Sequence, residues 1–304
     1  MSNVLLGCAI GDALGVFAES KPPTYQPLLD WDGKTFIGSP HHGLLPCCYS
    51  DDTMFSTALA QSLINCNGFN PDDLSARYVE MFVNKTIRGY GTTTLLAINK
   101  LITGTHWSES GTTNSYGNGS IMRAPVFGSY FRNDLKSLID AVNIDTKITH
   151  NSIEAIAGSL VGAIASFYAT NQDTDNLLEK IIIHLPNSEV KNKIMKIHDM
   201  IENPLITPNM AFQFFGTKCD VRMTAPTILY GFIKFDNYQD ACSTVIKMGG
   251  DTDTNSAIIG ALYGSKYGKN HFSNYHVKNI EDSAKLIALD NQLYHRSNSN
   301  FLQG

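Results

Sequence analysis

Residues 7–19 read GCAIGDALGVFAE and place Gly7, Gly11 and Gly15 at four-residue intervals. On an α-helix this spacing forms one stripe of small residues, along which the backbone of a neighbouring helix can approach closely. Because glycine costs about 1 kcal/mol per helical position relative to alanine, three glycines in one helix require a structural reason. The stretch therefore predicts a tightly packed, buried first helix. Asp12 and Glu19 would share one face of a continuous helix, and on the simplest interpretation both are surface acids.

The remaining sequence is mainly helical in pattern. Of 304 residues, 43% are hydrophobic and 17% charged, which is typical of a globular chain and not of a disordered one. Helical periodicity dominates and clean alternation is scarce. No shift in composition marks a domain boundary, so we expect one mostly α-helical domain over residues 1–304. Residues 21–49 and 103–119 are expected to form long loops, which are usually functional in a compact domain. The expected helices cover residues 54–64, 72–83, 92–102, 153–168, 175–184, 190–201, 224–234, 238–248, 255–267 and 277–293.

Charge and cysteine content exclude several classes of protein. With 23 Lys and Arg against 28 Asp and Glu, the net charge is −5 and no basic block is present, so direct binding to duplex nucleic acid is not expected. The cysteines lack zinc-ligand spacing, and the adjacent pair Cys47 and Cys48 is awkward for a disulfide. We therefore expect a reducing compartment, cytoplasmic or nuclear. A secretory signal is not apparent, and residues 155–169 are too short to span a bilayer, so neither secretion nor membrane association is expected.

The first chemical motif is Ser50-Asp51-Asp52-Thr53, directly before an apolar helix. Such residues at a helix start are good N-caps, and their charge complements the helix dipole. One cap uses one carboxylate, so the second is surplus to that role. Hard divalent cations prefer oxygen ligands, and the motif is therefore either a cap or half of a metal site.

The second motif, GGDTDTNS at residues 249–256, repeats this chemistry before another apolar helix. Gly249 and Gly250 permit a left-handed entry that lets several oxygens converge. An EF-hand is excluded because its ligand spacing and terminal Glu are missing. The two oxygen-rich motifs could close on one metal site, for which Mg²⁺ or Mn²⁺ suits the ligands better than zinc or copper.

The third motif is NSYGNGSIMRAP at residues 114–125. Gly117 and Gly119 flank Asn118, an arrangement that can direct backbone N–H groups at a phosphate, with Arg123 close by. Tyr116 could stack on a base. A plain Gly-Asn turn is the alternative interpretation. The lone His150, before a helix, is by itself more often a cap or core residue than a phosphate contact.

Together and in this order, the motifs GDALGVFAE, SDDT, YGNGSIMRAP, TH at residues 149–150 and GGDTDTNS resemble the ADP-ribosylglycohydrolase family. The resemblance implies an all-α fold, a compact single-domain orthogonal helical bundle with a central metal-lined cleft that holds two Mg²⁺ ions, with Mn²⁺ as the alternative. Ser50 stands where the family often has Thr, and residues 171–226 match no motif. Carried over, the metal ligands are Ser50, Asp51, Asp52, Asp251, Asp253 and Thr254; the catalytic acids are Glu19 and Asp52; and the residues that hold ADP-ribose are Ser115, Tyr116, Gly117, Asn118, Gly119, Ser120 and His150.

The resemblance also implies an activity. The expected enzyme is a monomeric hydrolase that cleaves the glycosidic bond between ADP-ribose and an acceptor, either a protein side chain such as Arg or Ser or a small conjugate. Ions at the ribose would activate a water molecule, and Glu19 would exchange protons with water or the leaving group. The alternative is a catalytically silent ADP-ribose-binding protein or a structural, crystallin-like relative, but such a protein has no need of both acidic motifs.

Overall fold

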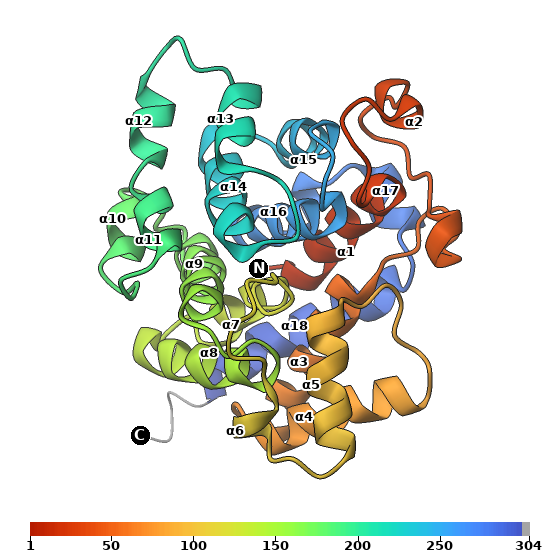
Figure 1. The fold of residues 1–304 in the computed structure, drawn as a ribbon, viewed down its shortest axis with the longest axis vertical. Helices are drawn as coiled ribbons and strands as arrows, with labels where there is room; N and C mark the ends of the chain where they lie inside the picture. Colours follow the sequence, from red (N-terminus) through yellow and green to blue (C-terminus); the bar gives the residue numbers. More distant parts are fainter. Residues whose placement is uncertain (300–304) are drawn as a thin grey trace.

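A computed structural model describes residues 1–299, and all of its regular structure is helical apart from three isolated β-bridges. The predicted all-α fold is thus confirmed (Figure 1). The α-helices are α1 (Val4–Gly15), α2 (Gln26–Leu29), α3 (Asp51–Cys66), α4 (Pro71–Val83), α5 (Thr92–Ile102), α6 (Trp107–Ser110), α7 (Pro125–Tyr130), α8 (Leu135–Thr149), α9 (Ile153–Thr170), α10 (Leu177–Ile182), α11 (Glu189–Ile194), α12 (Ile197–Glu202), α13 (Pro208–Phe215), α14 (Val221–Lys234), α15 (Tyr238–Lys247), α16 (Thr252–Tyr267), α17 (Asn274–Asn279) and α18 (Ser283–Ser299). Three short 3₁₀ turns join them: η1 (Val16–Ala18), η2 (Pro40–His42) and η3 (Lys269–His271).

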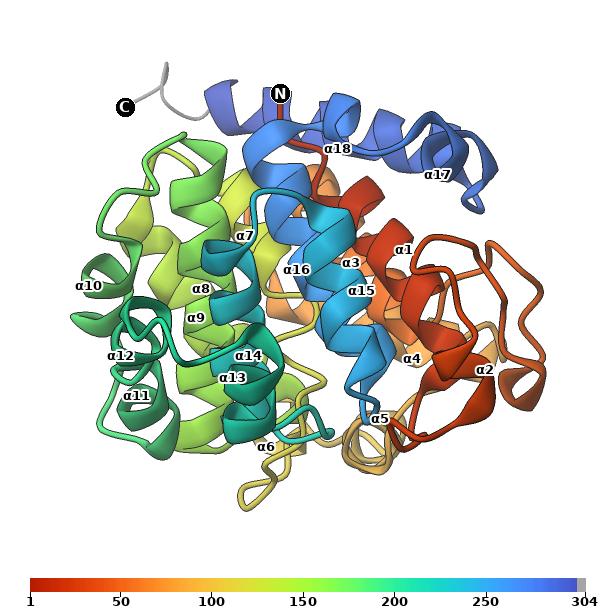
Figure 2. The ribbon, with the colours of Figure 1, turned by 90° about the horizontal axis from the view of Figure 1, so that it is seen from above.

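The glycine stripe of α1 packs directly against the backbone of α16, as the spacing predicts. A Cβ atom at Gly7 would lie 2.2 Å from the carbonyl oxygen of Gly260, and one at Gly15 would lie 2.3 Å from that of Thr252. Only glycine leaves room for this approach. The two helices lie side by side and antiparallel at the centre of the molecule (Figure 2). The carboxyl end of α1 and the amino end of α16 therefore meet at one place.

The other helices surround this central pair and share one hydrophobic core. Helix α18 runs across one face and contacts α1, α3 and α7, whereas α10, α11 and α12 lie at one edge (Figures 1 and 2). Helix α9 extends beyond the apolar run at 155–169 to 18 residues, so contrary to the expectation from that run it is long and apolar enough to cross a membrane, but 67% of its residues are buried inside the protein. Its apolar surface is accounted for by the core that it helps to form.

The amino end of α1 receives its cap from the far end of the chain. Asp290, on α18, accepts hydrogen bonds from the backbone N–H groups of Leu5 at 2.9 Å and Leu6 at 3.2 Å. These are two of the helix-start donors that have no partner within their own helix. The carboxylate thereby fixes α18 to the first turn of α1.

Several predicted elements differ in detail from the structure. The helix expected at 190–201 is two helices, α11 and α12, and that expected at 277–293 is divided between α17 and α18, with Asp282 in the left-handed region between them. Helices α7, α8 and α13 were not predicted. The long segments expected as loops contain only the short elements α2, η2 and α6.

Candidate active site

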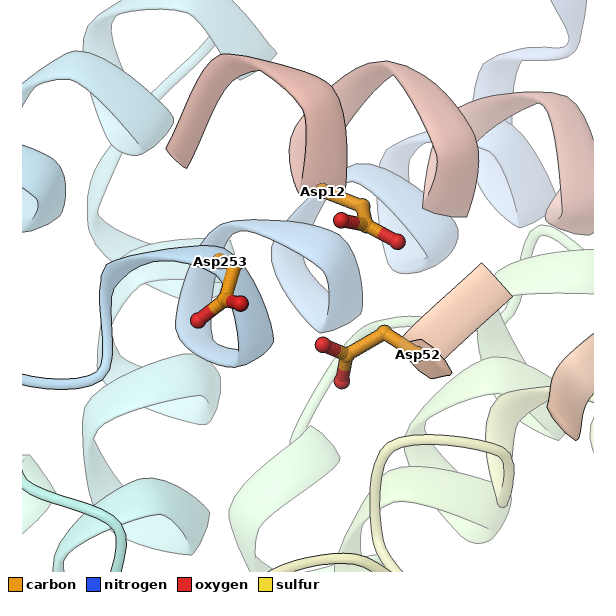
Figure 3. A group of neighbouring side chains, drawn as sticks. All are labelled: Asp12, Asp52 and Asp253. Carbon is orange, nitrogen blue, oxygen red and sulfur yellow. The ribbon is translucent and has the colours of Figure 1, made fainter. Parts of the chain in front are cut away.

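Three carboxylates from three helices meet where α1, α3 and α16 converge. Asp12 lies on α1, Asp52 in the first turn of α3 and Asp253 in the first turn of α16, and their side chains point toward one another (Figure 3). One carboxylate oxygen from each lies within 4.8 Å of the others. A second group with the same spacing joins Glu19 and Asp251 to Asp253. The two acidic motifs, some 200 positions apart, therefore do share one site, as the sequence predicted.

Asp12 is not the surface acid that the simplest interpretation of the sequence predicts, because it is fully buried. It accepts hydrogen bonds from the backbone N–H groups of Ser50, at 2.9 Å, and Thr53, at 3.1 Å, and from the Thr53 hydroxyl at 2.7 Å. These donors belong to the start of α3. Asp12 thus anchors that helix end to α1 and, by binding the first and last residues of the Ser50–Thr53 motif, sets the position of the two acids between them.

Local structure explains why the two motifs present several oxygens. Ser50 is the N-cap of α3, and its hydroxyl donates to Asp52 Oδ2 at 3.2 Å. Thr254 donates to the same oxygen from α16 at 3.3 Å. Gly249 and Gly250 both have positive φ, 71° and 82°, so the left-handed entry expected for this turn is present.

The electrostatics of the cluster favour a bound cation. Burial, and then repulsion from neighbouring carboxylates, raises the pKa values of Asp51, Asp52 and Asp253 well above their usual range. Asp52 Oδ1 is buried and has no hydrogen-bond partner among the described residues. Carboxylate oxygens that lie close together, are buried and lack some of their hydrogen-bond partners are suitable ligands for a hard divalent cation such as Mg²⁺ or Mn²⁺.

Glu19 lies beyond the end of α1, after η1, and not on a continuous helix with Asp12. Its side chain is 24% exposed, and Oε2 lies 2.6 Å from Nε2 of His42. Burial raises the pKa of Glu19 to about 7, with the charges of Asp251 and Asp12 adding to the effect. A carboxyl group with that pKa can both give and accept a proton near neutrality.

The acidic residues described above, apart from Asp12, line one cavity of about 330 Å³. Most of the predicted site residues face it, whereas Ser50, Ser115, Tyr116 and Ser120 do not line it. Ser50 is buried behind the cluster as the cap of α3, and Ser120 is buried against Ser159 of α9. The predicted residues that line the cavity are Glu19, Asp51, Asp52, Gly117, Asn118, Gly119, His150, Asp251, Asp253 and Thr254.

The glycine-containing loop is held by its own side chains. The Gly117 N–H donates to Ser115 Oγ at 3.1 Å, so this N–H is already engaged, unlike the free donor that the sequence suggested. Asn118 donates both to Asp251 Oδ2 and, at 2.9 Å, to Thr224 Oγ1. The loop is thereby joined directly to the acidic cluster.

Tyr116 directly precedes Gly117 of the cavity wall but does not itself line the cavity; it is 47% exposed, with the Arg222 guanidinium 4.0 Å from its ring centroid. His150 is buried beside the loop and donates to or accepts from Thr149 Oγ1 at 2.9 Å. Burial and the nearby charge of Arg123 lower the pKa of His150 to about 3, so the imidazole is neutral at physiological pH. A neutral ring offers one N–H donor and one acceptor.

Arg123, which the sequence placed near the expected phosphate, is instead a structural residue. It is fully buried and paired with Asp145 at 3.0 Å. It also donates to the Gly119 carbonyl at 2.7 Å and to Thr149 Oγ1 at 3.1 Å. The guanidinium therefore fixes the loop and the segment before His150 from behind.

Sequence reasoning missed one wall of the cavity. Gly89, Gly91 and residues 92–94, which form the start of α5, line it together with Met122 and Cys219. The signal is the run Gly-Tyr-Gly-Thr-Thr-Thr at residues 89–94, whose threonines form the first turn of α5. A glycine-rich entry followed by hydroxyls at a helix start is a common anion-binding arrangement.

The fold and the site thus define an all-α protein with a cavity lined by several acidic side chains, and comparison with known proteins gives its family. A model of the family described as ADP-ribosylglycohydrolase matches residues 2–302, so the chain belongs to that family. It is a hydrolase, as expected from the motifs.

Individual relatives agree with this assignment. The chain is 24% identical over 304 residues to the protein named ADP-ribosylhydrolase ARH3 of Xenopus tropicalis, covering 87% of this chain and 86% of that protein. It is 23% identical over 309 residues to ADP-ribosylhydrolase ARH3 of Homo sapiens, covering 87% and 84%. A solved structure described as an ADP-ribosylglycohydrolase-related protein complex has the same fold, with a TM-score of 0.81 at 23% identity over 97% of this chain and 96% of that one.

Proposed function

We propose that the protein cleaves the glycosidic bond between ADP-ribose and an acceptor, either a protein side chain such as Arg or Ser or a small conjugate. We further propose that it acts as a monomer in a reducing compartment, cytoplasmic or nuclear. One observation carries the enzymatic proposal: Asn118 of the glycine-containing loop is hydrogen-bonded to Asp251 of the acidic cluster. The loop that would hold the diphosphate and the acidic cluster that would act on the ribose are thus in direct contact.

The acidic cluster would hold two divalent cations, Mg²⁺ or Mn²⁺. The residues that would ligate them are Asp51, Asp52, Asp251, Asp253 and Thr254, with Ser50 beside them. When bound, the ions supply charge neutralisation and Lewis-acid polarisation at the ribose and at a water molecule. Asp12 takes a different role, since hydrogen bonds to the start of α3 already occupy its oxygens.

Glu19 is the residue assigned to proton transfer. It lies at the edge of the cluster and is the most exposed of its carboxylates, so it can reach a substrate in the cavity. With a pKa of about 7 it exchanges a proton with water or with the leaving group. Asp52, fully buried, contributes negative charge that stabilises an oxocarbenium-like transition state.

The remaining predicted residues bind the ADP portion. Gly119 and His150 lie on the cavity wall where the diphosphate would be held. The exposed ring of Tyr116, already stacked with Arg222 on one face, provides a surface for the adenine. On this proposal the ADP end of the substrate lies toward Tyr116 and the anomeric carbon lies toward Glu19.

The proposal is tested by incubating the protein with two otherwise identical peptides, one ADP-ribosylated on Arg and one on Ser, with and without Mg²⁺. Release of free ADP-ribose that depends on the cation supports it, and the faster substrate identifies the acceptor. Tight binding of ADP-ribose without release from either peptide or from a small ADP-ribose ester would contradict it.

A further inference from the structure

A second cavity, of about 540 Å³, adjoins the first. The two share Glu19, Cys219 and Asp251 as lining residues, so these three side chains form the partition between them. Nothing in the mechanism above uses this second space. Its position is nevertheless specific, because it opens on the side chain that is assigned to proton transfer.

Backbone hydrogen bonds join the three segments that form its walls. The Ser20 N–H donates to the Gly250 carbonyl at 2.7 Å, and the Gly250 N–H donates to the Lys21 carbonyl at 2.8 Å. The Asp251 N–H donates to the Thr217 carbonyl at 2.7 Å. The walls are therefore fixed relative to one another, and the cavity is preformed.

Each wall also continues directly into a residue of the partition. Ser20 follows Glu19, Lys218 precedes Cys219, and Gly250 precedes Asp251. Whatever occupies the second cavity is thus held by the same segments that position the proton-transfer residue and one of the proposed metal ligands.

The chemistry of the lining favours an acidic peptide. Pro22, Pro23 and Met248 provide an apolar surface for the stem of a side chain, and the cations Lys21 and Lys218 stand beside them. The two carboxylates of the lining, Glu19 and Asp251, group with Asp253 in the acidic cluster of the first cavity, so the lysines are the charges left for an occupant of the second. Lys218 is exposed and Lys21 partly so, which lets both ammonium groups reach an occupant. None of the residues that line this cavity is aromatic, so it lacks a ring on which a nucleotide base could stack.

We infer that the second cavity is the acceptor subsite, and that it takes a peptide with acidic side chains next to the modified residue. This inference rests on the proposed function: a glycosidic bond at Glu19 with ADP-ribose in the first cavity places its acceptor on the other side of the partition. Lys21 and Lys218 select among acceptors by charge. The ADP portion makes no use of them.

The test compares two peptides ADP-ribosylated on the same residue type, one flanked by Asp and Glu and the other by Lys and Arg. The wild-type protein is expected to show a kcat/KM about fivefold to tenfold higher for the acidic peptide, the size expected for two partly exposed charge pairs. The double variant Lys21→Glu/Lys218→Glu should reverse the preference. The matched control is Lys136→Glu, the same charge change at an exposed position of α8 that lines neither cavity.

The preference is the ratio of the kcat/KM values of the two peptides, measured on one protein preparation. A loss of folded protein lowers both values equally and therefore cancels from the ratio. A milder variant, Lys21→Met/Lys218→Met, should abolish the preference without reversing it. Equal use of both peptides by the wild type, or the same ratio in wild type and both double variants, would overturn the acceptor subsite while leaving the proposed function intact. Failure of the wild type to release ADP-ribose from any substrate would overturn both.

Discussion

The backbone of Gly11 lies so close to that of Ser256 that a Cβ atom on Gly11 would stand 2.0 Å from the Ser256 carbonyl oxygen. The Ser256 hydroxyl in turn donates to the Gly11 carbonyl at 2.7 Å. Asp12 immediately follows Gly11 on α1, and Asp253 lies one turn before Ser256 on α16. This contact therefore sets the separation of two carboxylates in the acidic cluster, and the small-residue stripe serves the site as well as the fold.

Substitution of Gly11 by Ala should consequently destabilise the protein. The added methyl would meet rigid backbone and not a mobile side chain, so α1 and α16 must separate. We expect a loss of about 3 kcal/mol in the free energy of unfolding, at the upper end for overpacking, measured by urea denaturation. The matched control is Gly91→Ala, where a Cβ would have nothing within 4 Å and where the cost should stay below about 1 kcal/mol. Equal losses in the two variants would show that the close helix contact is unimportant.

Removal of divalent cations should abolish activity. Chelation with EDTA is expected to stop the release of ADP-ribose, and added Mg²⁺ or Mn²⁺ to restore it. Binding should also raise the free energy of unfolding by mass action, by about 2.7 kcal/mol when the ion is at 100 times its dissociation constant. The thermal shift on addition of Mg²⁺ should shrink in Asp253→Asn and persist in Asp199→Asn, an exposed acid of α12. Full turnover in metal-free buffer would contradict this prediction.

The sequence predicted the parts of this molecule that depend on local pattern. The stripe of α1 and the N-cap of α3 follow from spacing and residue type, and the residue types of the two acidic motifs suggested that they could share one site. Contacts between residues that are far apart in the sequence could not be predicted in this way. Asp290 caps α1 from 285 residues away, and no local pattern distinguishes this carboxylate from a surface acid on an amphipathic helix.

The same physical distinction explains the errors at the site. Asp12 looks like a surface acid because its hydrogen-bond donors, at the start of α3, are 38 and 41 positions away. Arg123 looks like a phosphate ligand because its partner Asp145 is on the unpredicted helix α8. For α8 a local signal is present in the sequence, since Asp134 caps its amino end through Ser137.

Asp290 should make the stability of the protein depend on pH. Burial raises its pKa in the folded protein from 3.8 to about 7, so the folded state binds this proton more tightly than the unfolded state. The contribution of Asp290 to the free energy of unfolding therefore falls as the pH rises from about 4 to about 7, by at most about 1.4 kcal/mol per pH unit. Below about pH 4 Asp290 is protonated in both the folded and the unfolded protein, and above about pH 7 it is ionised in both, so its contribution to the free energy of unfolding is constant there.

The measurement is urea denaturation of wild type and Asp290→Asn at several pH values between about 4 and 8. The stability of the Asn variant relative to wild type should improve as the pH rises through the window, because the amide cannot ionise. The acidic cluster titrates identically in both proteins and cancels from the difference. Asp175→Asn, at an exposed position, is the control and should show no such trend. A flat difference for Asp290→Asn would mean that this carboxylate is ionised in the folded protein throughout.

Bulk at Gly119 should impair ADP-ribose binding more than folding. A Cβ atom there would lie 2.9 Å from His150 Cε1 and 3.0 Å from Thr94 Oγ1, so Gly119→Val displaces the loop or the imidazole on the cavity wall. Calorimetry should show at least about a tenfold loss of affinity for free ADP-ribose, equivalent to about 1.4 kcal/mol. The free energy of unfolding of the same variant should fall by less than about 1.4 kcal/mol. Equal affinity in wild type and variant would argue against a diphosphate at this loop.

Glu19 is the residue on which the assignment of proton transfer depends. Glu19→Gln preserves the shape of the side chain and its hydrogen-bonding reach but removes the titratable proton. Positioned acid–base catalysis is typically worth about 10²–10⁴-fold, so the rate of ADP-ribose release should fall at least about 10²-fold while the metal and ADP-ribose still bind. If Glu19 were only a solvated acid at a helix end, the change would alter stability by less than about 0.5 kcal/mol and leave turnover unchanged.

The contact between His42 and Glu19 provides a second test of the role of Glu19. Because His42 Nε2 lies 2.6 Å from Glu19 Oε2, His42→Ala should lower turnover through loss of the carboxyl group's position. In the Glu19→Gln background the same substitution should have little further effect, since residues that act through one another are not additive. The four proteins should be compared at saturating substrate. A loss of binding with unchanged turnover would make Glu19 a ligand or positioning residue, and turnover within a few-fold of wild type would assign proton transfer to an acid of the metal cluster.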